Sequence, residues 1–93
     1  MITLTNYKIT AQIHESFNSL VYRGIQLDGE IPVILKVLKA DYPTPAQLTR
    51  YKQEYEINRS LNIDGVAKVY SLENYQNTLV MSLEDLADRH SVY

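Results

Sequence analysis

The chain has 93 residues, of which 45% are apolar and 22% are charged, values typical of one small globular domain and not of a disordered segment. Its net charge of −2 argues against a nucleic-acid partner, because phosphate-binding surfaces are usually basic. It contains no cysteine, which excludes disulfides and thiolate metal sites. We find no signal segment and no apolar run near the roughly 20 residues that span a membrane. We therefore expect a soluble cytoplasmic domain.

The first half of the chain predicts three strands. Residues Tyr7–Ile13 alternate between apolar and polar side chains, the period of a half-buried strand. A second candidate strand covers Leu20–Leu27, and Asp28-Gly29 after it is a strong hairpin signal. Pro32–Leu38 is almost continuously apolar and β-branched, as expected of a central strand.

The second half predicts one helix and two more strands. Thr44 is a suitable N-cap and Pro45 suits the first helical position. The helix then runs over Ala46–Leu61 and ends at the turn residues Asn62–Gly65. The remaining predicted elements are a strand over Val66–Leu72, a polar turn at Asn74–Asn77 and a last strand over Thr78–Leu83. Short turns between the early strands favour antiparallel pairing, so we predict an α+β fold with a five-stranded antiparallel sheet and one packed helix.

Two charged residues interrupt apolar patterns in complementary ways. Lys36 lies inside the most apolar strand, and Glu54 lies on the helix stripe that contains Tyr51, Ile57 and Leu61. A carboxylate on an apolar stripe is unfavourable unless a cation or hydrogen-bond donors meet it. We therefore predict that Glu54 pairs with Lys36. The alternatives are that Lys36 faces solvent from a half-exposed strand and that Glu54 reaches water at the rim of the stripe.

Several motifs, in the right order, resemble the N-terminal lobe (N-lobe) of protein kinases. Val33-Ile34-Leu35-Lys36 resembles the kinase V-A-I-K strand. Arg50–Ile57 resembles the helix that carries the glutamate partner of the kinase lysine. Val66–Tyr70 is similar to the strand that follows this helix, and Leu79-Val80-Met81 to the strand that enters the hinge.

A narrower resemblance is to the serine/threonine kinase domain of large bacterial signalling hybrids that also contain a histidine-kinase module. It is carried by Ser19–Gly24, Pro32–Lys39 and Glu54–Leu61. The resemblance to kinases covers about residues 7–85, which is nearly the whole chain. We therefore interpret residues 1–93 as a single N-lobe without the second lobe (C-lobe).

The resemblance implies roles in binding ATP. Lys36 would contact the ATP phosphates and Glu54 would hold Lys36. Ile13 and Val21 would cover the adenine, Ile34 would line its pocket and Met81 would be the gatekeeper. The backbone of Ser82 and Glu84 would offer hinge hydrogen bonds to the adenine edge.

The chain also departs from the kinase pattern. The three glycine positions of the phosphate-covering loop fall on His14, Ser16 and Ser19, and glycines there let backbone N–H groups approach phosphates closely. Ile34 replaces the small alanine and narrows the adenine space. We therefore expect ATP binding to be weak or lost, with Mg²⁺ bound only together with nucleotide.

The catalytic and metal-binding motifs of kinases lie beyond the hinge, whereas this sequence runs only to Tyr93. We therefore expect no phosphoryl transfer by this chain alone. Two functions follow as alternatives. The first is a kinase N-lobe that keeps a partial ATP site, and the second is an interaction or dimerisation module that keeps the fold without the chemistry. An uncovered cleft face favours a homodimer, the C-lobe or another protein as partner.

Overall fold

The structure is a computed structural model that describes residues 4–39, 44–60, 67–76 and 78–86. Its elements follow the predicted order of three strands, one helix and two strands. Their bounds are β1 Tyr7–Glu15, β2 Ser19–Gln26, β3 Ile31–Leu38, α1 Pro45–Ser60, β4 Val69–Tyr75 and β5 Thr78–Glu84.

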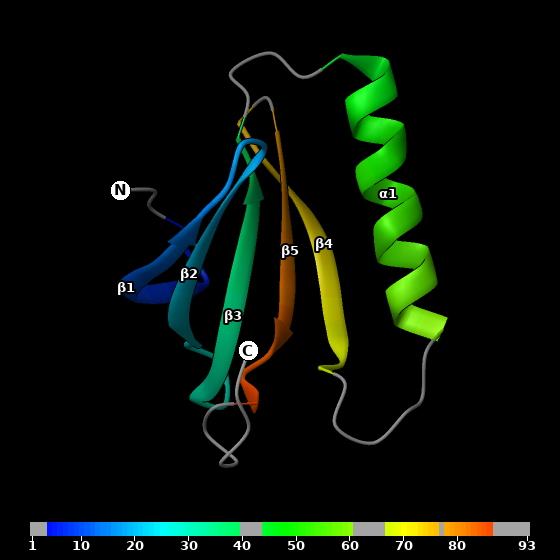
Figure 1. The fold of residues 1–93 in the computed structure, drawn as a ribbon. Helices are drawn as coiled ribbons and strands as arrows, with labels where there is room; N and C mark the ends of the chain where they lie inside the picture. Colours follow the sequence, from blue (N-terminus) through cyan, green and yellow to red (C-terminus); the bar gives the residue numbers. More distant parts are fainter. Residues whose placement is uncertain (1–3, 40–43, 61–66, 77, 87–93) are drawn as a thin grey trace.

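The five strands form one sheet with the order β1-β2-β3-β5-β4, and every neighbouring pair is antiparallel. The crossover through α1 takes the chain from β3 to the edge strand β4, and β5 then returns to the middle. Figure 1 shows α1 standing alongside β4 and β5 on one side of the sheet. The predicted α+β fold with a single packed helix is confirmed.

The alternation of side chains along β3 divides the apolar core between the two faces of the sheet. Leu38 packs with Tyr51 of α1 and with Leu79 and Met81 of β5, and we call this side the helix face. The opposite side, the back face, holds a second cluster of buried residues: Tyr22, Val33, Leu35, Val37 and Val80. Since β3 is covered on both faces, its nearly continuous apolar sequence is explained.

The β2–β3 turn falls at the predicted Asp28-Gly29. Gly29 and Glu30 both have positive φ, of 85° and 52°, a conformation that glycine adopts without strain. A second glycine is required by packing. A Cβ on Gly24 would lie 2.7 Å from the Lys8 carbonyl oxygen, so only a residue without a side chain lets β1 approach β2 there.

The start of α1 confirms the predicted N-cap. Thr44 Oγ1 accepts a hydrogen bond from the Gln47 N–H at 3.2 Å, and the Gln47 side chain accepts one from the Thr44 N–H at 2.8 Å. This reciprocal pair is a capping box, which satisfies two N–H groups that the first helical turn leaves without partners. Pro45 follows as the first helical residue, as expected.

Two details differ from the predictions. In β1, Ala11 and Ile13 are exposed, because irregularities between Ile9 and Ala11 and between Gln12 and His14 shift the register against β2 and break the period of two. The polar turn before β5 is shorter than predicted, since Asn74 still pairs with Leu79 and Tyr75 with Thr78. The predicted helix end at Leu61, the turn Asn62–Gly65, Val66 and Asn77 lie outside the described residues.

Candidate functional site

The structure brings the two predicted charged residues together. Lys36 Nζ lies 2.6 Å from Glu54 Oε1 and donates a hydrogen bond to it. The two side chains are 29% and 40% exposed, respectively. The predicted pairing is therefore confirmed, and the pair lies at the rim of the helix–sheet interface instead of in its interior. The carboxylate of Glu54 thus fixes the direction of the Lys36 side chain, and the Lys36 amine remains accessible to solvent.

The apolar stripe of α1 differs from the predicted one. Ile57 is 63% exposed, whereas Tyr51 is buried and Leu48 and Tyr55 pack against the helix-face cluster. These three residues are spaced by three and four positions and define the buried side of the helix. Glu54 lies beside this stripe, which explains why it can be half exposed and still reach the sheet.

Tyr51 fixes the backbone of β3 at the site. Its hydroxyl donates a hydrogen bond to the carbonyl oxygen of Lys36. Burial and, next, the charge of Glu54 raise the pKa of the Tyr51 phenol well above its usual value, because both oppose formation of a second negative charge there. Two residues of α1 thus hold Lys36 of β3. Tyr51 binds its backbone carbonyl oxygen, and Glu54 pairs with its side-chain amine.

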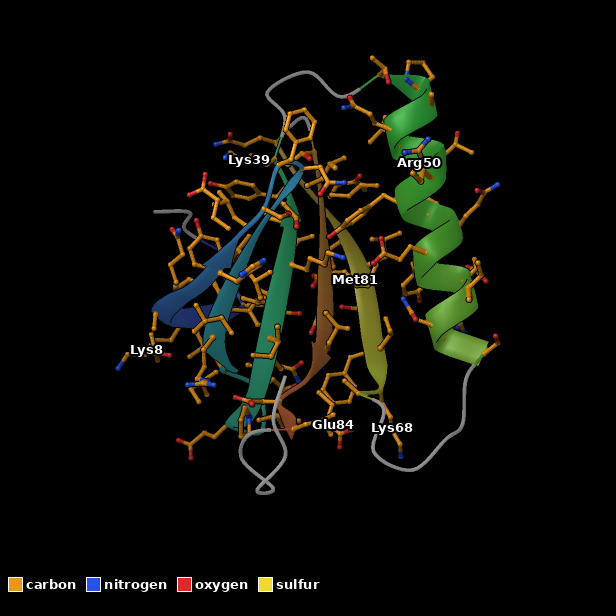
Figure 2. The ribbon with its side chains drawn as sticks, viewed as in Figure 1. Lys8, Lys39, Arg50, Lys68, Met81 and Glu84 are labelled. Carbon is orange, nitrogen blue, oxygen red and sulfur yellow. The ribbon has the colours of Figure 1, made fainter. Side chains whose placement is uncertain are left out.

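Of the residues predicted to line the adenine site, Val21 and Met81 flank Lys36 on the neighbouring strands, Ile34 shares its strand and Ile13 lies further away on β1. In the sheet register, Val21 of β2 and Met81 of β5 are the two cross-strand partners of Lys36. Ile34 lies two residues before Lys36 on the same face of β3, and only 6% of it is exposed. Met81 is fully buried in the helix-face cluster, and Figure 2 labels it on β5, next to β4. Ile13 lies in the β1 irregularity and is 38% exposed.

The β1–β2 loop, where kinases have their glycine-rich segment, is closed by its own side chains. Ser16 Oγ accepts a hydrogen bond from the Ser19 N–H at 3.2 Å and lies 2.8 Å from Ser19 Oγ. The Ser16 N–H donates to the Ser19 carbonyl oxygen at 2.9 Å. Lys39, which directly follows β3, pairs with Glu15 at the end of β1, where the loop begins. The hydrogen bonds between Ser16 and Ser19 therefore hold this loop in one turn, where glycines would leave the backbone free to adopt several conformations.

The predicted hinge residues lie inside the sheet. Ser82 pairs with Leu35 of β3 on one side and with Ser71 of β4 on the other. The Glu84 N–H donates to the Lys68 carbonyl oxygen at 2.8 Å. In this conformation that N–H is engaged with the residue just before β4, so a nucleotide would have to compete for it. Ser82 Oγ is buried and has no hydrogen-bond partner among the described residues.

An ion pair that the sequence did not predict lies close to Ile34. Arg23 Nε lies 3.2 Å from Asp85 Oδ2, where the arginine side chain is 42% exposed and the carboxylate only 4%. Arg23 is the β2 partner of Ile34. The signal available in the sequence was the period of two, which places Arg23 on the same face as Val21. The position of Asp85, just beyond the last strand, could not be read from any pattern.

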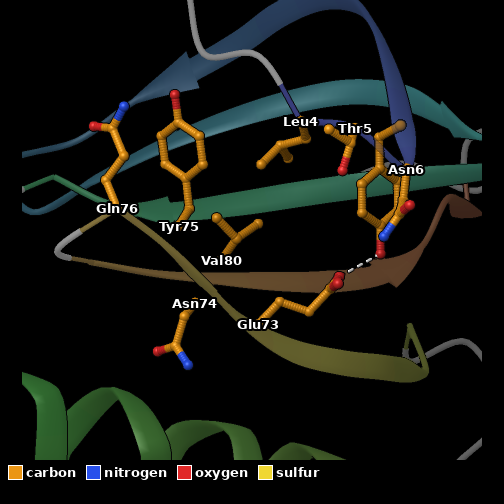
Figure 3. A pocket seen from close by; sticks show the side chains of 9 residues that line it. Leu4, Thr5, Asn6, Glu73, Asn74, Tyr75, Gln76 and Val80 are labelled. Atoms are coloured by element: carbon orange, nitrogen blue, oxygen red, sulfur yellow. Dashed lines mark hydrogen bonds between the residues drawn. The ribbon is translucent and has the colours of Figure 1, made fainter.

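The back face carries a separate hollow of about 340 Å³ between the N-terminal segment and the β4–β5 hairpin. Figure 3 shows Val80 at its floor and Glu73 at one side. Glu73 Oε2 accepts hydrogen bonds from the Tyr7 hydroxyl at 2.6 Å and from Ser71 Oγ at 3.2 Å. Burial and the bond to Glu73 raise the pKa of Tyr7. This polar cluster joins β1 to β4 across the sheet.

Within the ranges that the structure describes, no helix is long and apolar enough to cross a membrane. The same residues contain no cluster of three or more histidine, aspartate or glutamate side chains that could hold a metal ion.

Comparison with known proteins gives a likeness in structure alone. No protein-family model matches the chain, and no curated protein matches it. Among solved structures, the chain superimposes on a bacterial serine/threonine kinase domain described as "PpkA-294 apo form", with a TM-score of 0.77. The fold is that of a protein kinase N-lobe. The two sequences are 14% identical, and the match covers 90% of this chain but only 37% of the kinase.

Proposed function

We propose that this kinase N-lobe fold carries a partial ATP site, in which Lys36 receives the phosphates and the neighbouring helix face receives the adenine. The observation that carries the proposal is the Lys36–Glu54 pair, with 2.6 Å between nitrogen and oxygen. The pair joins the central strand to the only described helix of a kinase-like fold, which is the arrangement that positions a lysine for the phosphates of ATP in kinases.

The surroundings of Lys36 support this assignment. Its amine keeps access to solvent, so an anionic ligand can reach it without unfolding the helix. Val21, its partner on β2, is partly exposed and gives a purine ring an apolar neighbour beside the cation, whereas Met81, its partner on β5, is buried in the helix-face cluster. A lysine amine acts on phosphate oxygens as a point charge and does not require the bidentate geometry of arginine.

The residues present fit a phosphate group better than they fit a metal ion. Glu54 is already paired with Lys36, and the described residues contain no group of three or more histidine, aspartate or glutamate side chains that could hold a metal ion. Mg²⁺ would therefore arrive with the nucleotide, and its role would be to neutralise phosphate charge. The residues of this chain would bind and orient the nucleotide, and we propose no phosphoryl transfer by them alone.

The experiment that tests this proposal is a titration of the purified chain with Mg·ATP and with Mg·ADP, followed by backbone amide NMR. We expect shift changes centred on Val21, Lys36 and Ser82, with an affinity in the millimolar range because the serine loop does not present glycine-like N–H groups. The Lys36→Ala variant should lose these changes. Its free energy of unfolding should fall by no more than about 1 kcal/mol, since the ion pair is partly exposed.

Lys52→Ala provides the matched control. Lys52 is exposed on α1, so its loss lowers the net charge by the same amount without touching the proposed site. If both lysine variants weaken nucleotide binding equally, the attraction is general electrostatics and the assignment of Lys36 is wrong. If no residue responds at millimolar nucleotide, the partial ATP site is excluded.

The second candidate function is a protein-interaction module without nucleotide chemistry. It is favoured by the closed loop at Ser16 and Ser19 and by the exposure of Ile57 on the side of α1 that carries Glu54. The apolar surface around the exposed Ile57 could be covered by a second copy of the chain, a C-lobe or another protein. The narrower resemblance to the kinase domain of bacterial signalling hybrids, and a role in signal transduction, belong to either candidate. The nucleotide titration separates the two.

A further inference from the structure

The Arg23–Asp85 ion pair crosses the part of the site proposed for adenine. Arg23 belongs to β2, and Asp85 directly follows the last residue of β5. In the sheet, β3 lies between these two strands. A side-chain contact of 3.2 Å between residues on either side of β3 must therefore pass over β3 or around its end.

The face on which the pair crosses is the helix face. Tyr22 packs in the back-face cluster, so its neighbours Val21 and Arg23 point to the opposite side. Arg23 is paired in register with Ile34, which in turn is paired with Leu83. Asp85 is two residues beyond Leu83, and the period of two places both on the same face of the sheet. The bridge therefore spans the row of residues that includes Ile34.

The residues at the adenine end of the proposed site are buried, as expected if the ion pair covers that end. Ile34 is 6% exposed, Asp85 6% and Leu86 9%, although a kinase N-lobe uses the position of Ile34 to contact the nucleotide base. Lys36, only two residues further along β3, keeps 29% of its side chain exposed. The phosphate end of the proposed site is thus open, whereas the adenine end is covered.

We propose that Asp85 and Leu86 form a strap that the Arg23 guanidinium holds against the adenine surface, so that a nucleotide base binds only after this ion pair opens. This inference rests on the proposed ATP site and adds a regulatory contact to it. The apparent affinity for a nucleotide is then reduced by the fraction of molecules in which the strap is open. Ligands that engage only Lys36, such as inorganic pyrophosphate, bypass the strap.

The asymmetric burial of the pair selects the variant for the test. Removing Arg23 would leave a buried carboxylate without its cation, which is strongly destabilising. Removing Asp85 leaves an arginine that is already 42% exposed and can be hydrated. Asp85→Ala therefore opens the strap with the smaller disturbance of the fold. Glu56→Ala, at an exposed position of α1, removes the same charge elsewhere and controls for the weaker repulsion of anionic ligands.

Two measurements on the wild type and both variants separate the strap from the proposed function. The first uses no nucleotide and follows paramagnetic relaxation of the Ile34 methyl groups by a neutral gadolinium chelate in solution. We expect a several-fold increase in Asp85→Ala and none in Glu56→Ala. The second measures the affinities for Mg·ADP and for pyrophosphate. We expect Asp85→Ala to bind ADP about three- to tenfold more tightly than Glu56→Ala does, with no difference between them for pyrophosphate.

The outcomes are distinct. Unchanged Ile34 relaxation in a folded Asp85→Ala protein overturns the strap, whether or not nucleotide binds. Increased relaxation with no ADP binding in any variant supports the strap as a structural contact and rejects the ATP site. An equal gain for ADP and pyrophosphate rejects a strap that acts on the base, because the change would then be one of net charge near Lys36.

Discussion

At the scale of single residues, Lys36 concentrates most of the interactions that define the site. Its amine is held by Glu54, and its carbonyl oxygen is held by the Tyr51 hydroxyl. The sequence predicted the first contact because it placed Glu54 on an apolar stripe, where a carboxylate requires a partner; the pair forms although the observed stripe passes beside Glu54. It did not predict the second, since a tyrosine on a buried helix side is equally well explained by packing alone.

Tyr51 should make the fold sensitive to alkaline pH. A raised pKa in the folded state means that the folded protein holds the phenol proton more tightly than the unfolded chain. The stability from Tyr51 is then complete below the unfolded pKa of about 10 and is lost as the pH rises above it. We expect the denaturation midpoint to fall between about pH 9 and pH 11, and to fall less in Tyr51→Phe.

Circular dichroism during urea denaturation at each pH provides the measurement. Tyr55→Phe removes a hydroxyl from the same helix and serves as the control. If Tyr51→Phe follows the wild-type curve over the whole alkaline range, the phenol is not held in the buried and neutral state that we describe.

At the scale of elements, the structure confirms the predicted ends of helices and strands where a particular residue type is required at that position. The N-cap at Thr44 and the turn at Asp28-Gly29 were predictable because capping and positive φ require particular residue types. The irregularities of β1 were not, because they depend on how β1 fits against β2. The exposure of Ile57 was missed for a similar reason: the rotation of α1 on the sheet is decided by packing and not by the helix sequence.

The capping box at the start of α1 should contribute measurably to stability. Thr44→Ala removes the side chain that accepts the Gln47 N–H, and we expect a loss of about 1 kcal/mol in the free energy of unfolding. Thr49→Ala, at an exposed position inside the same helix, should be neutral or slightly stabilising because alanine is the better helix former. Equal effects in urea denaturation would show that the cap does not define the start of α1.

The contact of β1 with β2 depends on the missing side chain of Gly24. Gly24→Ala should destabilise the protein by about 1–3 kcal/mol, because the new Cβ meets the Lys8 backbone and not a flexible side chain. Gly29→Asn is the comparison, since asparagine tolerates the left-handed region that this turn requires. If Gly24→Ala is no more destabilising than Gly29→Asn in thermal denaturation, the close approach of the two strands is wrong.

At the scale of the whole molecule, the kinase-like fold was predictable because several loose motifs occurred in the right order, and the structural likeness supports that fold at 14% identity. The site was predictable only in part. The residue pattern predicted the pairing of Lys36 with Glu54, and the resemblance to kinases suggested the flanking apolar residues. It could not reveal the closed serine loop or the Arg23–Asp85 pair, because both depend on contacts between segments whose spacing carries no signal.

Association is the second property of the whole molecule that can be tested. Ile57 on α1 and Phe17 in the β1–β2 loop present apolar side chains to solvent, with Phe17 98% exposed. We expect a reversible dimer in sedimentation-velocity experiments at high protein concentration, weakened in Ile57→Lys. A single monomeric species over the full concentration range would contradict this expectation.

The central claim is that Lys36 is placed to receive the phosphates of a nucleotide. The most direct measurement is labelling with an acyl-phosphate derivative of ATP, which transfers its acyl group to an amine lying beside the phosphates and releases ATP. Peptide mass spectrometry then locates the acylated lysines. We predict that acylation is concentrated on Lys36 and is suppressed by excess ATP. Labelling that follows exposure, with Lys8, Lys52 and Lys68 modified as much as Lys36 and no protection by ATP, would contradict the account.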